Sequence, residues 1–285
     1  MAKVIVCGLQ KGGVGKSTIV KNLGYALSQQ GQRVCMVDFD PQSNLTISCG
    51  IDQPGKLPVT IGHLMELELN GETLPNRAEY ILSSDGVHLI PSSKYLSVAE
   101  NQLRMEMGCD RILSSILHPL RPDYDYILID IGPTEGILTV NALCAADTVL
   151  IPMDLQLFAL AGVHEILVSV KKLRRRIKPN LDIAGIVFNR FDTITNLSGQ
   201  IIADTRNAYG DQIHLFESAI PQTVDIGTAH YFSQPVALYK PKSKAAIAFQ
   251  SLATEFIGQC PAGKAGEAVC ERERRPAKLP VRLTC

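Results

Sequence analysis

The chain lacks the features that mark a membrane protein, a secreted protein or a strongly charged nucleic-acid binder. No segment approaches the roughly 18 consecutive apolar residues of a membrane span, and the first apolar run is too short for a signal peptide. The formal net charge over 285 residues is zero, so attraction of the whole chain to nucleic acid or anionic lipid is not expected. The eight cysteines include no Cys-x-x-Cys pair, and several stand in apolar runs typical of buried free thiols. We therefore expect a cytoplasmic protein with reduced cysteines and no membrane attachment.

The chain alternates apolar strand-like runs with amphipathic helical segments. Hydrophobic residues make up 46% of it and charged residues 20%, which suits one large globular core. The pattern predicts strands at 3–8, 33–39, 87–91, 124–130, 148–152, 183–189 and 213–220. It predicts helices at 15–30, 60–69, 96–107, 111–120, 136–145, 160–177 and 244–257, with one more between the last two strands. Continuous apolar strands separated by helices indicate the α/β class, with a doubly wound, mostly parallel sheet covered by helices on both faces.

The composition changes at the end of the last predicted helix. Residues 259–285 contain three prolines, six Lys or Arg residues and three Glu residues, without apolar periodicity. Such a segment buries too little apolar surface to fold by itself. We therefore predict one domain over residues 1–258, followed by a disordered, mildly basic tail over 259–285.

The strongest local signal is a glycine-rich loop directly after the first apolar run. The segment from Gln10 to Thr18 reads QKGGVGKST and follows the run VIVCG. Its glycines let backbone N–H groups turn inward around a triphosphate, so that Lys16 can reach the β- and γ-phosphates and the Ser17 hydroxyl can ligate Mg²⁺. Gln10 stands where the common pattern has its first glycine, and Lys11 adds a second lysine. The loop predicts a nucleotide site of the P-loop NTPase type, in which Lys11 needs a function of its own.

Carboxylates stand at the predicted ends of two other strands. Asp38 and Asp40 belong to the run VDFD after the second strand, and Asp130 ends the run YILID. Since ligands of open α/β sheets bind at the carboxyl ends of the strands, we expect these carboxylates near the phosphate loop. A strand-terminal aspartate of this kind typically faces Mg²⁺ through water. The three carboxylates and the loop together indicate a site for a nucleotide with Mg²⁺.

These motifs resemble those of the ParA/Soj-type partition ATPases, which belong to the deviant P-loop class with MinD and the nitrogenase iron protein. The resemblance rests on KGGVGKS at 11–17, on DFDPQSN at 38–44, and on Asp130 followed by GILTVNAL at 136–143. It continues through IP at 151–152 with ALAG at 159–162, and through IP at 220–221 with QPVALY at 234–239. It covers residues 1–258 and implies a P-loop NTPase fold for the whole predicted domain.

The resemblance implies a role for each matching position. Lys11 would be the signature lysine that crosses a face-to-face dimer to the partner's nucleotide, where its charge neutralises phosphate. Asp40 would orient or activate the attacking water. The catalytic residues implied are Lys11, Lys16 and Asp40. The nucleotide-binding residues implied are Lys11, Gly12, Gly13, Val14, Gly15, Lys16, Ser17, Thr18 and Asn189, and the Mg²⁺ site would be formed by Ser17, Asp38 and Asp130.

Two of these residues have a second interpretation. Asn189 ends a strand-like run, where relatives in the wider class place an asparagine on the adenine edge, because an amide can both donate and accept. The same side chain would equally serve as a strand-end cap. Asp38 could likewise be a structural carboxylate rather than part of the Mg²⁺ site.

The resemblance implies an ATPase that uses ATP and Mg²⁺ to operate a dimerising switch. Two ATP-bound subunits would close face to face, bind non-specific DNA, and reopen after slow hydrolysis stimulated by a partner protein. The implied partners are a second copy of the chain, a centromere-binding protein of the ParB type and DNA, with no membrane. The cargo would be a plasmid, a mobile element or a chromosome region. The protein would be cytoplasmic, and nucleoid-associated when it binds DNA.

The positions that bind DNA in the family depart from its pattern. The Soj-like segment Ile-Pro-Arg-Asn-Val-Arg reads here IPQTVD at 220–225, so Gln222 and Asp225 replace arginines, and Ile194 replaces a third. Because non-specific DNA affinity comes from contacts of Lys and Arg with phosphates, this loss weakens the expected DNA binding. Substitutes exist in the basic run 171–178 and in Lys240, Lys242 and Lys244. These could equally be a helix end stabilised by its dipole and solvated surface lysines.

A second departure follows Asp130. The family segment Cys-Pro-Pro-Ser reads here IGPT at 131–134. We expect Gly132 to loosen that turn, because glycine has more backbone freedom than proline.

Other functions explain less of the sequence. The same ATPase switch could regulate or position a protein target without DNA, which the missing arginines favour. A P-loop metabolic ligase would need a small-substrate pocket and leaves Lys11 and Asn44 unexplained. An iron–sulfur carrier would need paired cysteines at a dimer axis, for which Cys109 and Cys144 are candidates by number alone. A MinD-like membrane role would need a C-terminal amphipathic helix, which the proline-containing tail does not provide.

Overall fold

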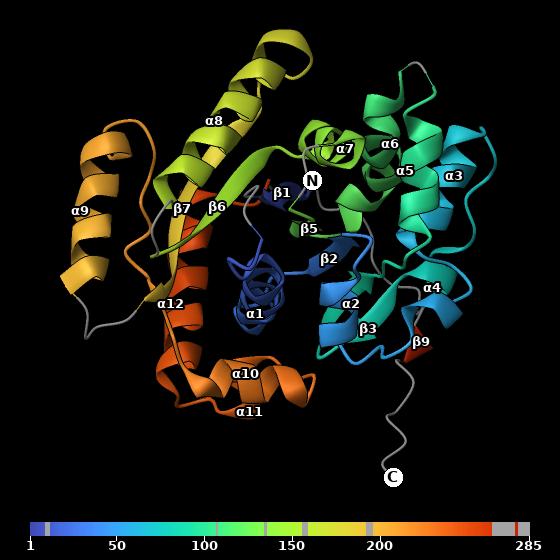
Figure 1. Cartoon of the computed structure of the whole chain (residues 1–285). Coiled ribbons are helices and arrows are strands. Elements are labelled where there is room, and N and C mark those ends of the chain that lie inside the picture. Colours follow the sequence, from blue (N-terminus) through green and yellow to red (C-terminus); the bar gives the residue numbers. More distant parts are fainter. Residues whose placement is uncertain are drawn as a thin grey trace.

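In the computed structural model the chain forms one sheet with helices on both of its faces (Figure 1). The structure describes residues 1–8, 12–106, 108–133, 136–155, 159–191, 196–263 and 277–278. Within them the strand order is β8-β7-β6-β1-β5-β2-β4-β3-β9. The strands are β1 (Lys3–Cys7), β2 (Val34–Phe39), β3 (Leu82–Ser84), β4 (Val87–Ile90), β5 (Tyr126–Ile131), β6 (Thr148–Asp154), β7 (Asp182–Phe191), β8 (Ile220–Pro221) and β9 (Ala277–Lys278). All pairings are parallel except that of β3 with β4.

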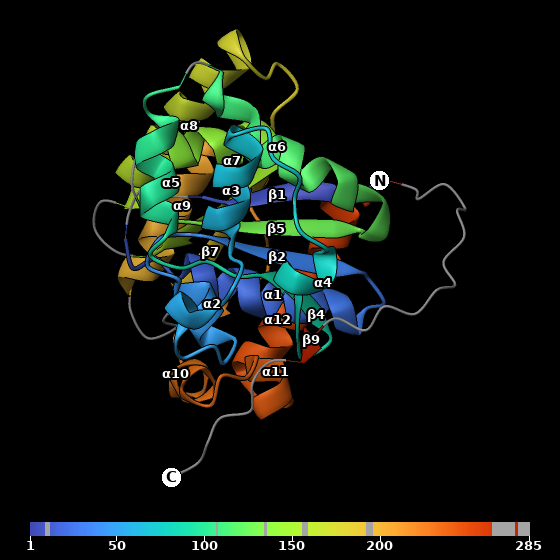
Figure 2. The same cartoon turned by 90° about the vertical axis from the view of Figure 1, so that its right-hand side faces the viewer.

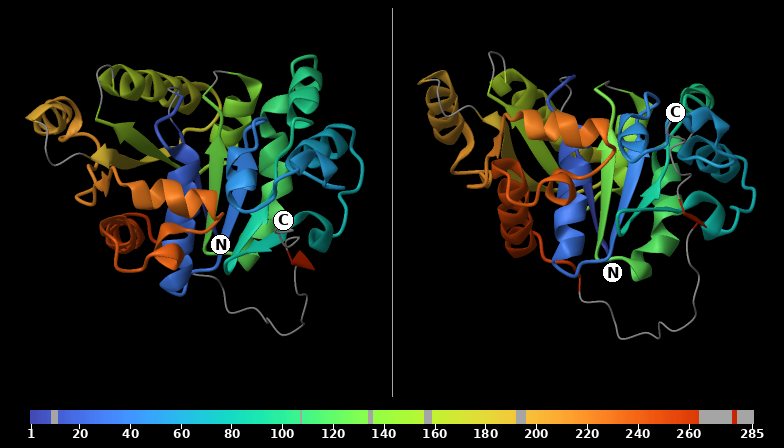
Figure 3. Two further views of the ribbon diagram at one scale, coloured as in Figure 1. Left: turned by 60° about the horizontal axis from the view of Figure 1, so that its bottom comes forward. Right: turned by 90° about the horizontal axis from the view of Figure 1, so that it is seen from below.

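The helices form a layer on each face of the sheet (Figures 1 and 2). One layer holds α1 (Lys16–Gln29) and α12 (Lys244–Gln259), which lie side by side in the view from below (Figure 3). The other layer holds α3 (Ile61–Leu69), α5 (Leu96–Leu103), α6 (Ile112–Leu117), α7 (Ile137–Ala145) and α8 (Ala159–Arg176). The remaining helices are α2 (Asn44–Ser48), α4 (Arg77–Tyr80), α9 (Asn196–Tyr209), α10 (Val224–Tyr231) and α11 (Val236–Tyr239).

Each central strand is buried on both faces, which explains its continuous apolar sequence. Along β1, Val4 and Val6 pack toward the α7 and α8 layer, while Ile5 and Cys7 pack toward α1 and α12. Successive side chains of a strand point to opposite faces, so every side chain of a strand covered on both sides is buried, which favours apolar residues throughout. The predicted α/β class with a doubly wound, mostly parallel sheet is confirmed.

The predicted strand at 213–220 is mostly absent. Only Ile220–Pro221 joins the ladder, with one isolated bridge between Ile186 and Leu215. The backbone N–H groups of Glu217 and Ser218 donate to the Glu255 carboxylate at 2.8 and 3.1 Å. Because a side chain on α12 takes these donors, they do not pair with β7, and the segment stays irregular.

The packed part of the chain extends slightly beyond the predicted boundary at residue 258. The Tyr126 hydroxyl donates to the backbone oxygen of Cys260 at 2.9 Å, and Cys260 is buried. Ala277–Lys278 pairs with β3. The rest of the predicted tail, at 264–276 and 279–285, lies outside the described residues. Among the described helices, none combines the length and the apolar character needed to cross a membrane.

We predict that Gly62→Ala destabilises the fold, because α3 approaches α5 too closely there for a side chain. A Cβ on Gly62 would lie 2.7 Å from the Leu96 backbone nitrogen, and backbone cannot move aside cheaply. Overpacking of this kind should lower the free energy of unfolding by about 1–3 kcal/mol, outweighing the roughly 1 kcal/mol that alanine gains in a helix. Urea denaturation measures the effect. Gly55→Ala is the matched control, because a Cβ there meets nothing within 4 Å; equal stability of the two variants would contradict the prediction.

Candidate nucleotide-binding site

The sheet brings the carboxylates of two strands together beside the start of α1. In the parallel register, Cys7 of β1 lies opposite Asp130 of β5, and Asp130 lies opposite Asp38 of β2. Register partners in neighbouring strands point to the same face. That face is the one covered by α1, since Cys7 packs in the α1 and α12 layer. The two aspartates predicted from separate motifs are therefore neighbours, next to the helix that the glycine loop opens.

The described part of the glycine loop has the backbone that the motif requires. Gly13 and Gly15 have positive φ angles of 77° and 86°, which only glycine adopts without strain. Gly15 is followed directly by α1, whose first-turn N–H groups form a positive helix terminus without an acidic side chain. Gly12 and Gly13 are exposed and Val14 is buried. Lys11 lies outside the described residues.

Asn189 fixes the loop from the neighbouring strand. Its amide nitrogen donates to the Val14 carbonyl oxygen at 2.7 Å, and the side chain is only 3% exposed. A Cβ on Gly15 would lie 2.3 Å from this same nitrogen. The end of β7 thus packs directly onto the phosphate loop, so that Asn189 holds the backbone that would bind phosphate.

Lys16 is buried at the base of the site. Its side chain is 7% exposed, and burial lowers its pKa, while the charges of Asp130, Cys7 and Asp40 act in the opposite direction. A buried ammonium beside carboxylates supplies positive charge without competing solvent. Ser17 and Thr18 follow at the first turn and are half-buried.

Asp130 is a carboxylate buried beside the start of α1. It is 1% exposed, and neither of its oxygens has a hydrogen-bond partner among the described residues. Burial, and then the charge of Asp38, raises the pKa of Asp130 well above its ordinary value. The nearby Ser17 hydroxyl and the positive charge of Lys16 lower this pKa by less. A buried carboxylate normally has its hydrogen bonds satisfied. Two unpartnered oxygens beside a serine hydroxyl at a phosphate loop fit Mg²⁺, which takes one or two carboxylates in addition to phosphate oxygens and water.

Asp38 is already engaged by the protein. Its Oδ2 accepts hydrogen bonds from the Thr46 backbone nitrogen at 2.7 Å and from the Thr46 hydroxyl at 2.6 Å. Its Oδ1 accepts from the Asp40 backbone nitrogen at 3.2 Å. Burial nevertheless raises its pKa, ahead of these stabilising contacts. Asp38 therefore anchors the first turn of α2 to β2 in addition to lying next to Asp130.

Asp40 rests against the turn that follows β5. Its Oδ1 accepts from the Gln42 backbone nitrogen at 2.9 Å. A Cβ on Gly132 would lie 3.2 Å from Asp40 Oδ1, and a Cβ on Gly12 would lie 3.8 Å from Pro133. The glycine predicted to loosen this turn has a definite spatial role here, because it leaves room for the Asp40 carboxylate beside the phosphate loop.

Two supporting residues were missed from the sequence. Besides bonding Asp38, the Thr46 hydroxyl accepts from the Ser92 backbone nitrogen at 2.9 Å. The Ser92 hydroxyl in turn donates to the backbone oxygen of Asp40 at 2.8 Å. Their contacts join segments some fifty residues apart, and neither residue stands in a recognisable motif.

The surface at α10, near the positions of the missing arginines, exposes several apolar side chains. Val224 is 85% exposed and Tyr231 is 73% exposed on α10, and the neighbouring Phe232 is 52% exposed. Asp225 forms an ion pair with Lys240 at 2.9 Å, so one of the substitute lysines is already paired. Ile194 lies outside the described residues.

In the basic run at 171–178, some side chains have partners and others have none among the described residues. Arg174 donates to the Leu181 carbonyl oxygen and lies 3.4 Å from the Asp182 carboxylate. Lys178 donates to the Cys144 carbonyl oxygen at 2.6 Å. The remaining four, Lys171, Lys172, Arg175 and Arg176, are exposed on α8.

The amino-acid sequence is similar to those of known proteins. A family model described as "AAA domain" matches residues 2–183. The chain is 34% identical over 259 residues to the chromosome partitioning protein ParA of Caulobacter vibrioides, covering 90% of this chain and 94% of that one. It is 32% identical to the sporulation initiation inhibitor protein Soj of Bacillus subtilis, covering 90% and 98%.

A solved structure has the same fold. The protein from Mycobacterium smegmatis described as cobyrinic acid a,c-diamide synthase, with bound ATP analog and magnesium, superposes with a TM-score of 0.76 at 32% identity. The match covers 89% of this chain and 93% of that one.

We predict that Asp130→Asn stabilises the protein when nucleotide and divalent cations are absent. The folded chain raises the pKa of Asp130 above its ordinary value of 3.8. Above that value the unfolded chain is ionised while burial opposes ionisation in the folded chain, so wild-type stability falls as the pH rises. Asparagine cannot ionise, so its stabilising advantage over aspartate should be small near pH 4 and larger near pH 8.

Urea denaturation in EDTA at the two pH values tests this prediction. The exposed Asp211→Asn is the control and should show no pH-dependent gain. A gain for Asp130→Asn that is equal at both pH values would show that the buried charge is not its cause.

Proposed function

The chain belongs to the ParA/Soj-type family of P-loop ATPases, and we propose that it is an ATP-driven dimerising switch that acts in partition of DNA. ATPase activity belongs to the family. The observation that carries the proposal for this chain is the unpartnered, buried Asp130 carboxylate beside Lys16 and Ser17 at the start of α1. A merely structural aspartate would have its oxygens satisfied by the fold.

Each residue of the site has a place in this proposal. The loop from Gly12 to Gly15 and the first turn of α1, through Thr18, bind the phosphates of ATP, with Lys16 on the β- and γ-phosphates. Ser17 and Asp130 hold Mg²⁺, with Asp38 supporting its water shell. When bound, Mg²⁺ neutralises phosphate charge and orients the β- and γ-oxygens.

Asp40 orients the water that attacks the γ-phosphate. Its carboxylate is held beside the phosphate loop by Gln42 and by the space at Gly132. Asn189 stabilises the loop through its hydrogen bond to the Val14 carbonyl oxygen. Its amide oxygen would contact adenine. Lys11 crosses to the nucleotide of a second copy, which makes closure of the dimer dependent on ATP.

The proposed cycle involves a second copy of the chain, DNA and a ParB-type protein. Two ATP-bound copies close, bind non-specific DNA, and reopen after slow hydrolysis that a ParB-type protein stimulates. The cargo is a plasmid, a mobile element or a chromosome region. The protein is then nucleoid-associated while it is dimeric.

We expect Lys16→Ala to abolish ATP binding, because the phosphates lose their buried counter-charge. Isothermal titration calorimetry with ATP and Mg²⁺ should show at least a hundredfold loss of affinity, equivalent to about 2.7 kcal/mol. Lys56→Ala, which removes an exposed lysine on another segment, should bind like the wild type. Retained affinity in Lys16→Ala would place the phosphates elsewhere.

Asp40→Ala and Lys11→Ala should separate hydrolysis from dimerisation. Asp40→Ala should bind ATP and accumulate as a dimer on gel filtration, because closure occurs without turnover. Lys11→Ala should bind ATP and remain monomeric, because the partner's phosphates lose their counter-charge. Asp211→Ala serves as the control for loss of a carboxylate. A monomeric Asp40→Ala in saturating ATP rules out the switch.

A second function is favoured by the surface of α10 and its neighbours. Where DNA-binding arginines are expected, this chain has Gln222 and an Asp225 already paired with Lys240, next to exposed Val224, Tyr231 and Phe232. Exposed apolar residues in one place are typical of protein interaction surfaces. The same switch would then regulate or position a protein target without DNA.

Salt dependence of DNA binding distinguishes the two functions. A 30-base-pair duplex is titrated with Asp40→Ala in ATP at about 50 and 200 mM salt. Partition on DNA predicts binding that requires ATP and weakens steeply with salt, because phosphate contacts release counterions. Absent or salt-insensitive binding would favour the protein target.

A further inference from the structure

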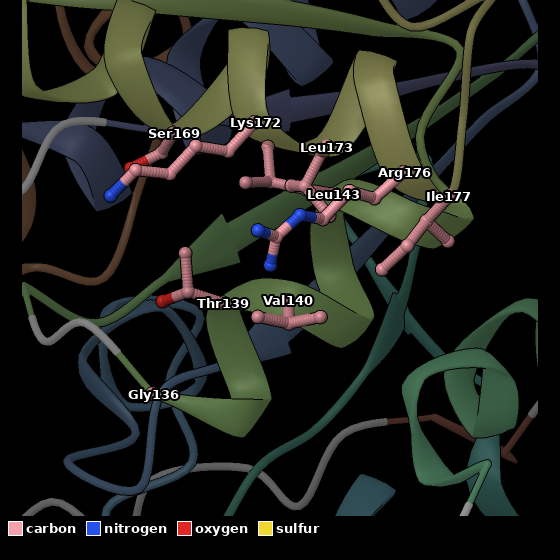
Figure 4. Close-up of a pocket in the computed structure, with 9 residues that line it drawn as sticks. All are labelled: Gly136, Thr139, Val140, Leu143, Ser169, Lys172, Leu173, Arg176 and Ile177. Carbon is pink, nitrogen blue, oxygen red and sulfur yellow. The ribbon is translucent and has the colours of Figure 1, made fainter.

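A cavity of about 260 Å³ lies between α7 and α8, on the sheet face opposite to α1 (Figure 4). It is separate from the residues assigned to the nucleotide. Its lining comes from both helices and from Gly136, the residue before α7.

The floor of the cavity is apolar. Val140 and Leu143 come from α7, and Leu173 and Ile177 come from α8 and the residue after it. The hydroxyl-bearing side chains of Thr139 and Ser169 stand at one end (Figure 4). Ligand pockets typically combine an apolar lining with a few polar groups that fix orientation.

Two cations stand at the rim, one helical turn apart. Figure 4 shows the Arg176 guanidinium reaching from α8 into the space above Thr139 and Val140, and the Lys172 ammonium lying toward Ser169. Within the described part of the chain neither side chain has a hydrogen bond or ion pair, whereas their neighbours Arg174 and Lys178 both do. Like charges at positions i and i+4 of a helix repel each other. An anion between them would remove that repulsion.

We propose that this cavity binds a small amphipathic carboxylate, with its hydrocarbon body on the apolar floor and its carboxylate between Lys172 and Arg176. The volume equals that of about nine water molecules in the liquid, so the buried body has roughly nine non-hydrogen atoms. The planar guanidinium of Arg176 can bind a carboxylate with two parallel hydrogen bonds. This inference does not depend on the proposed function, because no residue of the nucleotide site takes part.

The competing explanation is that the basic residues only stabilise the carboxyl end of α8. Cations in the last turn of a helix are favoured by its dipole wherever they point. Arg175 separates the two explanations, because it lies in the same turn and is exposed but does not line the cavity. If the cavity binds a ligand, substitution of Arg176 or Lys172 should lower the affinity, and substitution of Arg175 should not.

Titration of the full chain with octanoate, by calorimetry or by ligand-observed NMR, tests the proposal. We expect one saturable site with a dissociation constant of about 1 mM or tighter, since a ligand of this size has limited binding energy. Acetate lacks the apolar body and octylamine carries the opposite charge, so neither should compete. Arg176→Gln and Lys172→Gln should each weaken octanoate at least fivefold, while Arg175→Gln should change it less than twofold.

Further variants keep the outcome interpretable. Val140→Phe should fill the cavity and remove octanoate binding, with the midpoint of thermal unfolding as the check on its fold. Lys16→Ala should bind octanoate like the wild type, which separates this site from the nucleotide. Absence of saturable binding, equal losses in Arg175→Gln and Arg176→Gln, or competition by acetate would overturn the proposal.

Discussion

The structure depends on the burial of two carboxylates side by side at the ends of β2 and β5. Asp38 and Asp130 are register partners, almost without solvent, and burial raises the pKa of each. Two such charges repel each other and are unfavourable in a protein interior unless positive charge lies close by. The start of α1 supplies that charge through Lys16 and the helix terminus. A cation bound by nucleotide phosphates would add to that positive charge beside the two carboxylates.

The segments around the pair are fixed by contacts that come from distant parts of the chain. Asp38 is bound by Thr46, which is linked through Ser92 to the backbone of Asp40. On the other side, Asn189 holds the loop carbonyl of Val14. These contacts leave Asp130 as the carboxylate whose oxygens are open to a ligand among the described residues. The segments around Asp130 are therefore held in place by hydrogen bonds within the protein, as an electrostatically prepared binding site requires.

The central fold and the site could be predicted because their signals are local. A continuous apolar run predicts a buried strand. An aspartate or a glycine loop directly after it indicates the carboxyl edge of the sheet, where ligands bind. Thr46 and Ser92 could not be predicted, because their partners are set by the pairing of β2 with β4 and not by spacing. The strand predicted at 213–220 was wrong because Glu255, on the distant helix α12, accepts hydrogen bonds from the N–H groups of Glu217 and Ser218. Gly132 was expected to loosen its turn, whereas only the folded structure reveals Asp40 beside it.

We propose that Asp130 and Ser17 form a site for Mg²⁺ bound together with ATP. The most direct measurement is the midpoint of thermal unfolding with ATP in Mg²⁺, compared with ATP in EDTA. At a hundred times the dissociation constant, bound ligand adds about 2.7 kcal/mol of stability, which for a domain of this size raises the midpoint by roughly 5–10 °C. We expect that rise in Mg²⁺ and little change of the midpoint in EDTA. An equal rise in both conditions would contradict it.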